Sequence, residues 1–133
     1  MKQTYTILVV DDEPVNVFLL TKILEIHKYS VITAESGTEA LQIMEQVIPD
    51  LVLLDLLMPR VNGFEVLAHL KKSDILNNVP TIIVSALNDS EIKEKAHIAG
   101  AIAYLTKPVS KKLILSTVED ILNENNHGAI IKQ

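Results

Sequence analysis

Five short runs of mostly apolar residues recur along the 133-residue chain, and polar residues do not alternate within them. They are residues 7–10, 31–34, 51–54, 81–84 and 102–105. A strand that is apolar on both faces is typical of a parallel sheet covered on both sides, whereas a half-exposed strand alternates apolar and polar residues. The sequence therefore predicts five buried strands in one parallel sheet.

Segments with helical periodicity separate these runs. The spacing of apolar residues predicts helices over residues 14–27, between Ser36 and Pro49, and over residues 64–72, 89–99 and 109–123. Strands that alternate with helices, joined by right-handed crossovers, predict an α/β fold with helices on both faces of the sheet. We therefore expect a three-layer αβα sandwich.

Local motifs predict where some of these helices begin and end. Ser36 and Glu39 have the spacing of a capping box, in which each side chain accepts a backbone hydrogen bond at the start of a helix. Pro49 should end the same helix. Gly100 is placed to follow the last turn of the helix over residues 89–99, where glycine is favoured.

The composition excludes several classes of protein. The chain carries 12 basic and 17 acidic residues, a net charge of −5, which argues against a nucleic-acid-binding face. The absence of cysteine excludes disulfides and thiolate metal sites. No apolar stretch reaches the ~18 residues of a membrane span, and the N-terminus lacks a signal-peptide core. We expect a cytoplasmic protein without membrane contact, with one domain over residues 1–124 and a polar tail over residues 125–133.

Three acids and one lysine follow predicted strands. Asp11 and Asp12 follow the first strand, Asp55 follows the third, and Lys107 follows the fifth. The carboxyl ends of parallel strands meet at one edge of the sheet, where ligands bind. Clustered carboxylates favour a hard divalent cation such as Mg²⁺, and a carboxylate can act as a nucleophile on phosphorus. The sequence therefore predicts a site for metal-dependent phosphoryl transfer at this edge.

Each candidate residue also has an ordinary structural role when it is taken alone. Asp11 or Asp12 can cap the following helix, and Lys107 can be a solvated loop residue. Ser85 is common in turns, and Tyr104 has the amphipathic character of a packing residue. Their arrangement at one sheet edge favours a shared function over five independent structural roles.

The order and spacing of these motifs resemble the receiver domains of two-component response regulators. The resemblance covers nearly the whole chain, from Ile7 to Leu122. It is carried by the acidic pair Asp11-Asp12, the segment Asp55-Leu56-Leu57-Met58-Pro59 with Gly63, the pair Ser85-Ala86, Tyr104, and the pair Lys107-Pro108. The resemblance implies a flavodoxin-like fold with the strand order 2-1-3-4-5.

The resemblance also implies roles for the site residues. Asp55 would be the phosphoacceptor, and Asp12 and Asp55 would be direct Mg²⁺ ligands. Asp11 would act mostly through water, and the backbone carbonyl of Leu57 would complete the protein ligands. Lys107 would pair with Asp55 at rest and with a phosphoryl oxygen afterwards.

Further implications concern the switch and the partners. Ser85 would donate a hydrogen bond to a phosphoryl oxygen and, together with Tyr104, would act as the switch. The Lys107–Pro108 peptide bond would be cis. A histidine kinase or a histidine phosphotransfer protein would supply the phosphoryl group, and a downstream protein would bind the face of the fourth helix, fifth strand and fifth helix. Such a domain assists its own phosphorylation and dephosphorylation and is not otherwise an enzyme.

Two leucines depart from the usual pattern of the family. Leu57 and Leu87 lie two residues beyond Asp55 and Ser85, at positions that flank the path of the hydrolytic water. Their side chains offer that water no donor or acceptor, so we expect a long-lived phosphoryl group. The residues before Tyr104 lack the paired acids of regulators that dimerise through this face, so that salt-bridged dimer is not expected.

Other interpretations were weighed against this one. A metal-dependent phosphohydrolase also uses an aspartate nucleophile, but it usually has a second acid where this chain has Leu57. A flavodoxin-like cofactor binder would carry Ser, Thr and Gly in the first turn, where this chain has acids that repel phosphate. A receiver within a hybrid histidine kinase or a multidomain regulator is a third interpretation, and the opening from Asp11 to Asn16 resembles such receivers.

Overall fold

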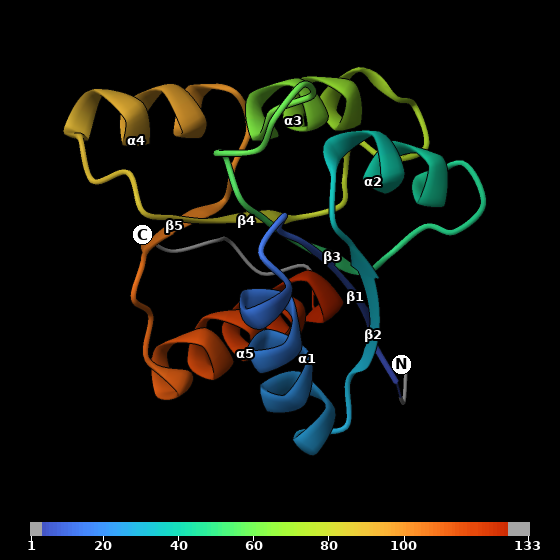
Figure 1. Ribbon diagram of the computed structural model, residues 1–133. Coiled ribbons are helices and arrows are strands. Elements are labelled where there is room, and N and C mark those ends of the chain that lie inside the picture. The colour runs from blue at the N-terminus through green and yellow to red at the C-terminus, as the bar shows by residue number, and fades with distance from the viewer. Residues whose placement is uncertain (1–3, 128–133) are drawn as a thin grey trace.

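Three layers make up the fold, with one parallel sheet between two layers of helices (Figure 1). The computed structural model describes residues 4–127. The strands are β1 (Thr6–Val10), β2 (Ser30–Ala34), β3 (Leu51–Leu54), β4 (Thr81–Ser85) and β5 (Ala103–Thr106), and the helices are α1 (Pro14–Ile26), α2 (Gly37–Met44), α3 (Gly63–Lys72), α4 (Ser90–Ile98) and α5 (Lys111–His127). The sheet has the order β2-β1-β3-β4-β5. The predicted sandwich and strand order are confirmed.

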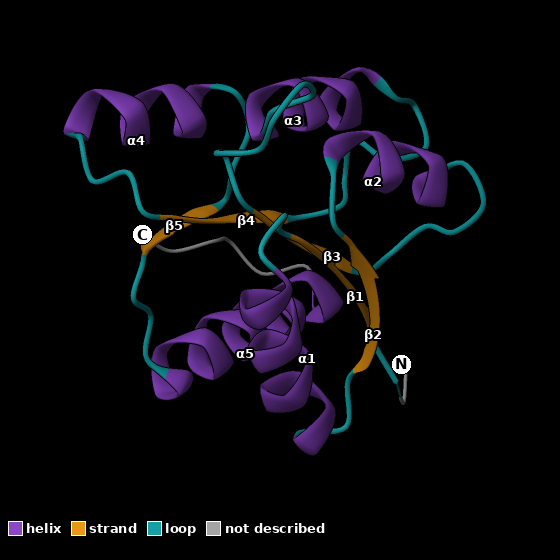
Figure 2. Ribbon diagram, in the orientation of Figure 1, coloured by secondary structure: helices purple, strands orange, loops and turns teal. Residues whose placement is uncertain are grey.

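The two faces of the sheet bury two separate apolar layers. α2, α3 and α4 cover one face, and α1 and α5 cover the other (Figure 2). In β1, Leu8 and Val10 pack toward the first layer, whereas Ile7 and Val9 pack toward the second. Because both faces of the central strands are buried, polar residues have no place in them, which explains the absence of alternation.

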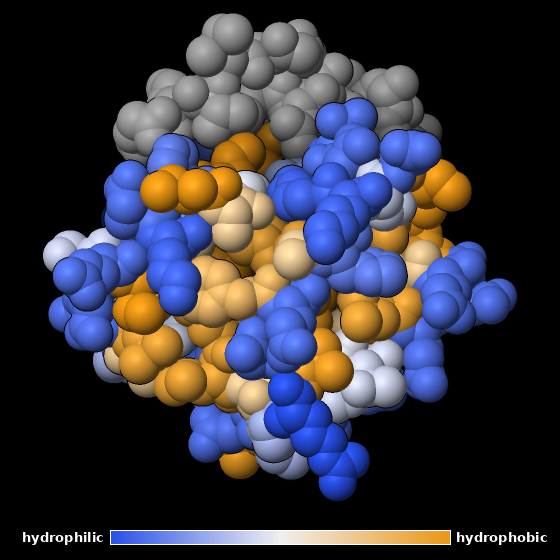
Figure 3. Space-filling view, turned by 90° about the horizontal axis from the view of Figure 1, so that it is seen from above, coloured by the Kyte–Doolittle hydropathy of each residue, from blue (hydrophilic) through white to orange (hydrophobic). Residues whose placement is uncertain are grey.

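The outer face of the α2–α3–α4 layer mixes hydrophilic residues with smaller apolar patches (Figure 3). Scattered apolar side chains on a surface are normal in a folded domain. Within the described residues, no helix is both long enough and apolar enough to cross a membrane.

α2 begins as predicted but ends earlier. The Ser36 hydroxyl accepts a hydrogen bond from the Glu39 N–H at 3.0 Å, while the Glu39 carboxylate accepts one from the N–H of Glu35, one residue before the cap. The helix ends at Met44, so the prediction that it continues to Pro49 is wrong. Beyond Met44 the N–H groups of Glu45 and Gln46 donate to the carbonyls of Gln42 and Ile43, three residues back, so the last turn tightens and the helix ends.

α3 begins with a capping box that we did not predict. The Asn62 side chain accepts from the Glu65 N–H at 3.1 Å, and the Glu65 carboxylate accepts from the Asn62 N–H at 2.9 Å. The first helical residue, Gly63, lies against the preceding loop, because a Cβ there would lie 2.4 Å from the backbone carbonyl oxygen of Asp55. The cap and the close contact together fix α3 against the end of β3.

The remaining boundaries differ from the prediction by a few residues. Gly100 follows α4 with φ +113° and donates its N–H to the His97 carbonyl at 3.0 Å, which confirms its predicted place. α5 extends to His127 and so includes the first residues of the predicted polar tail. Residues 128–133 lie outside the described residues, and the boundary at residue 124 stays a prediction.

Candidate functional site

The carboxyl edge of the sheet brings two acids and a lysine together. Asp11 directly follows β1 and Asp55 directly follows β3, and both are almost completely buried, with exposed fractions of 2% and 5%. Their N–H groups donate to the carbonyls of Ala34 and Val10, so each residue continues the hydrogen bonding of the sheet. The backbone positions of both carboxylates are therefore fixed by the strands.

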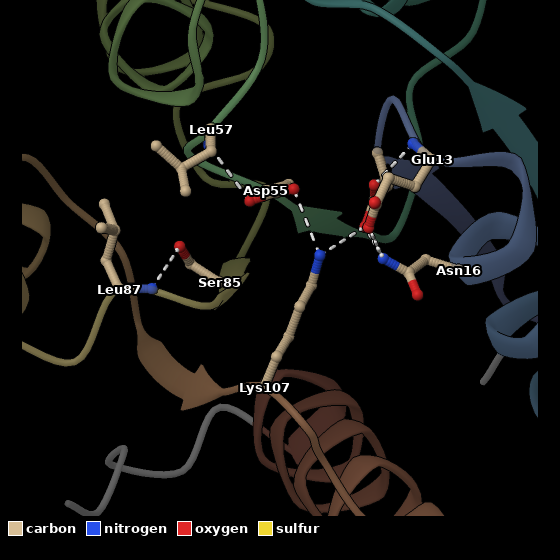
Figure 4. A network of polar contacts seen from close by, with 8 residues as sticks. Glu13, Asn16, Asp55, Leu57, Ser85, Leu87 and Lys107 are labelled. Atoms are coloured by element: carbon tan, nitrogen blue, oxygen red, sulfur yellow. Dashed lines mark hydrogen bonds and ion pairs between the residues drawn. The ribbon is translucent and has the colours of Figure 1, made fainter.

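Lys107 lies between the two buried carboxylates. Its Nζ is 2.9 Å from Oδ2 of Asp11 and 3.2 Å from Oδ2 of Asp55 (Figure 4). The Lys107 N–H also donates to the Ser85 carbonyl at 2.8 Å, which ties the backbone of the lysine to the end of β4. The Lys107–Pro108 peptide bond is cis. We expected a pair with Asp55 alone, and the structure adds a shorter contact with Asp11.

Asp11 has further partners at the start of α1. Its Oδ1 accepts from the Glu13 N–H at 2.9 Å, and its Oδ2 accepts from Nδ2 of Asn16 at 3.4 Å. The Asn16 amide also donates to the Glu13 carboxylate at 2.7 Å. Glu13 and Asn16 had no predicted role, although both lie in the segment from Asp11 to Asn16 that resembles receivers of larger proteins.

Three carboxylates meet at this edge. Oxygen atoms of Asp11, Asp12 and Asp55 lie within 4.8 Å of one another. Lys107 contributes one positive charge beside them, so the group keeps a negative balance. Hard divalent cations take oxygen ligands and are commonly held by a small number of carboxylates. The donor set of three carboxylates therefore fits Mg²⁺.

Burial and neighbouring charges shift the pKa values at the site. Burial raises the pKa of Asp55, and the repulsion from Asp11 acts in the same direction, while the Leu57 N–H and Lys107 oppose the rise. For Lys107, burial alone would lower the pKa, but the hydrogen bonds and attraction from Asp11 and Asp55 outweigh it and raise the pKa. Lys107 therefore stays charged, and Asp55 is a more basic carboxylate than an exposed aspartate.

Two hydrogen-bonded loops flank Asp55. The Leu57 N–H donates to Oδ1 of Asp55 at 3.1 Å, and the Leu87 N–H donates to the Ser85 hydroxyl at 3.2 Å. The Tyr104 hydroxyl donates to the Leu87 carbonyl at 2.7 Å. The turn after β4 is thus bonded to Ser85 on one side and to Tyr104 on the other.

Comparison with known proteins decides the family. A family model of the response regulator receiver domain matches residues 7–119. The chain belongs to this family. It is 38% identical over 116 residues to the protein PilH of Pseudomonas aeruginosa, which covers 87% of this chain and 96% of PilH. It is 32% identical over 121 residues to the polar-differentiation response regulator DivK of Brucella ovis, which covers 91% of this chain and 98% of DivK.

Solved receiver structures have the same fold. A CheY-like response regulator receiver domain from Methanospirillum hungatei superposes with a TM-score of 0.89 at 28% identity, covering 96% of this chain and the whole of that one. Receiver domains are phosphoacceptor signalling modules and not classical enzymes. The acids, Ser85 and Lys107 of this receiver lie at the carboxyl edge of its sheet, where ligands of such folds bind.

Two leucines lie close to Asp55. Figure 4 shows Leu57 and Leu87 on one side of Asp55, and Lys107 and Asn16 on the other. One side of the carboxylate therefore carries two leucine side chains beside the Ser85 hydroxyl, and the other side carries the lysine and the asparagine.

Proposed function

We propose that this receiver accepts a phosphoryl group on Asp55 from a histidine kinase or a histidine phosphotransfer protein, and that phosphorylation changes a binding surface. The observation that carries this proposal is the arrangement of Asp55, a buried carboxylate with Lys107 on one oxygen and the Leu57 N–H on the other. Catalysis of phosphoryl transfer depends mainly on positioning and on neutralising charge, and these contacts supply both.

The proposed reaction is a direct transfer from the histidine to Asp55. One Asp55 oxygen attacks phosphorus, the bond from phosphorus to the imidazole nitrogen breaks, and the histidine leaves with the electron pair and takes up a proton. Lys107 then pairs with a phosphoryl oxygen, and the Ser85 hydroxyl donates to another. Asp11, Asp12, Asp55 and the Leu57 carbonyl would hold Mg²⁺, which neutralises negative charge on the phosphoryl oxygens.

The contacts favour Asp55 over Asp11 as the nucleophile. Oδ1 of Asp11 accepts from Glu13, and Oδ2 accepts from both Lys107 and Asn16. Three donors therefore stabilise the negative charge of the Asp11 carboxylate, which makes it a weaker nucleophile. Asp55 has two such donors, one on each oxygen.

The turn after β4 supports a route from the site to the surface. Ser85 accepts from the Leu87 N–H, and the Leu87 carbonyl accepts from Tyr104. If the Ser85 hydroxyl turns to a phosphoryl group and leaves the Leu87 N–H, the turn that also accepts from Tyr104 loses one of its two anchors. We propose that the face of α4, β5 and α5 has two packings and that phosphorylation selects one.

Intact-protein mass spectrometry tests the phosphoacceptor. Treatment with acetyl phosphate and Mg²⁺ should add one phosphoryl group to the parent protein and none to Asp55→Asn. The exposed Asp74 provides a matched control, because Asp74→Asn removes a carboxylate from a surface loop. Equal labelling of Asp55→Asn and the parent would contradict the assignment. Transfer from a phosphorylated histidine phosphotransfer protein, followed by the same measurement, tests the class of donor.

A further inference from the structure

A groove of about 430 Å³ opens between the loop after β3 and the loop after β4. Its lining is mainly apolar and includes Leu57, Met58, Pro59, Phe64 and Leu87. Small-molecule sites typically have volumes of roughly 300–1,000 Å³ and mostly apolar walls. The groove therefore has the size and the surface of a site for a small apolar group.

Hydrogen bonds connect the walls of this groove to the site. Leu57 donates its N–H to Asp55, and Leu87 donates its N–H to Ser85. The side chains of both leucines lie on the side of Asp55 that faces away from Lys107 (Figure 4). Leu57 keeps 51% of its surface exposed, although it stands beside a buried carboxylate. One end of the groove is therefore next to the nucleophile.

The geometry of phosphoryl transfer places the leaving group near this end. The attacking and leaving oxygens lie roughly in line through phosphorus. Because the Asp55 carboxylate attacks from the edge of the sheet, the leaving oxygen points outward, between the leucine side and the lysine side of the site. An apolar chain on that oxygen gains free energy where it is removed from water, which is on the leucine side.

We propose that the groove binds the acyl chain of small acyl phosphates, so that donors with an apolar chain phosphorylate Asp55 faster than acetyl phosphate does. This inference rests on the proposed role of Asp55. In the reaction, an Asp55 oxygen bonds to phosphorus, the bond from phosphorus to the acyl oxygen breaks, and the carboxylate leaves with the electron pair. No proton has to move, because both carboxylates are ionised.

A series of donors tests the inference on the unaltered protein. Acetyl, propanoyl and butanoyl phosphate release carboxylates of similar basicity, so their rates of phosphorylation differ mainly through contacts of the chain. Each methylene that is fully removed from water should raise the second-order rate constant about fourfold. Because the groove is open, we expect butanoyl phosphate to react about three to ten times faster than acetyl phosphate.

Variants then locate the effect. Leu57→Ala and Leu87→Ala should each lower the ratio of the butanoyl to the acetyl rate constant toward one. Ile98→Ala is the matched control, because Ile98 is an exposed apolar residue at the end of α4 and should leave the ratio unchanged. Phosphoramidate, which has no acyl chain, reports the reactivity of Asp55 itself in each variant.

The outcomes separate this inference from the proposed function. Labelling of Asp55 by every donor at equal rates would overturn the acyl-chain site and leave the phosphoacceptor role intact. A high ratio that persists in both leucine variants would also overturn the groove as the binding site. Failure of every donor to label Asp55 would overturn the proposed function, and this inference with it.

Discussion

The two edges of the sheet hold their carboxylates in different surroundings. At the carboxyl edge, Asp11 and Asp55 lie within one cluster with Asp12, and a single lysine contacts two of the three. At the opposite edge, the Asp50 carboxylate accepts a hydrogen bond from the Thr6 N–H at 2.7 Å, which joins the start of β1 to the residue before β3. The first arrangement collects three like charges around one cation, whereas the second joins two strands through one carboxylate.

This difference indicates which edge is organised for chemistry. Like charges in a buried cluster reduce stability, because each disfavours the ionised form of the others. The backbone hydrogen bonds that Asp11 and Asp55 accept from Glu13 and Leu57 offset only part of this cost. We infer that the acid cluster at the carboxyl edge lowers the free energy of unfolding of the metal-free protein.

Removal of the lysine should have the largest effect on stability. Lys107→Met leaves Asp11 and Asp55 buried without their common cation, and breaking a buried ion pair from one side is strongly destabilising. We expect the free energy of unfolding of the metal-free protein to fall by about 2–4 kcal/mol. Urea denaturation measures it, and the exposed Lys111 provides the control variant Lys111→Met. If Lys107→Met lowers the free energy of unfolding no more than Lys111→Met does, the buried acids at the carboxyl edge do not depend on Lys107 for stability.

Polar groups in place of the two leucines should shorten the life of the phosphoryl group. Leu57→Asn and Leu87→Glu supply a contact that can orient the attacking water, and one such contact is worth roughly ten- to a hundredfold in rate. The measurement is the decay of phosphorylated protein after the donor is removed. If the variants decay no faster than the parent, the apolar side of the site does not control the lifetime.

Replacement of Asp55, the proposed phosphoacceptor, should stabilise the metal-free protein at neutral pH. Burial raises the pKa of Asp55 above the unfolded value of about 3.9, so its ionised form opposes folding. The cost is present above the folded pKa and disappears as the pH falls below the unfolded value. Asp55→Asn should therefore raise the free energy of unfolding by about 1 kcal/mol near neutral pH and by less near about pH 4.

Urea denaturation in a metal chelator at both pH values measures this dependence. Asp74→Asn, in an exposed loop, is the control for the loss of one charge. If Asp55→Asn raises the free energy of unfolding equally at both pH values, or lowers it at neutral pH, ionised Asp55 does not destabilise the fold.

The smallest effect is expected at the opposite edge. Thr81, the first residue of β4, is fully buried, and its hydroxyl has no partner among the described residues. Thr81→Val keeps the shape and should raise the free energy of unfolding by about 0.5–1 kcal/mol without changing phosphorylation. Thr117→Val is the contrast, because its hydroxyl donates to the Leu113 carbonyl at 2.7 Å and its loss should not stabilise. Thermal unfolding of both variants measures the change in stability. Destabilisation by Thr81→Val would refute the argument.

The strands were predictable because burial on both faces imposes a composition. β3 was predicted to the residue, and β1, β2 and β4 to within one residue at an end. The end of α2 was not predictable from apolar spacing, since the periodicity continues past Met44 after the backbone has left the helix. The capping box at Asn62 had a visible signal, a glutamate three residues later, and we overlooked it.

The site was predictable as a set of residues and less so as a set of contacts. The position of Asp11, Asp55 and Lys107 at one edge follows from strand ends and sheet topology. The shorter distance from Lys107 to Asp11, and the role of Asn16, depend on side-chain directions that no spacing in the sequence encodes. The distances from Lys107 to the two carboxylates therefore require a three-dimensional structure.

The contact between Gly63 and the backbone of Asp55 has a consequence for mutational tolerance. A Cβ at position 63 would meet the Asp55 carbonyl oxygen at 2.4 Å and the Leu56 Cα at 2.7 Å, and neither atom belongs to a side chain that can turn away. The first carbon of any side chain therefore meets the same obstacle, whatever follows it. In a library of all substitutions at position 63, only glycine should be tolerated. At the neighbouring position 62, tolerance should instead decrease gradually with the capping ability of the residue.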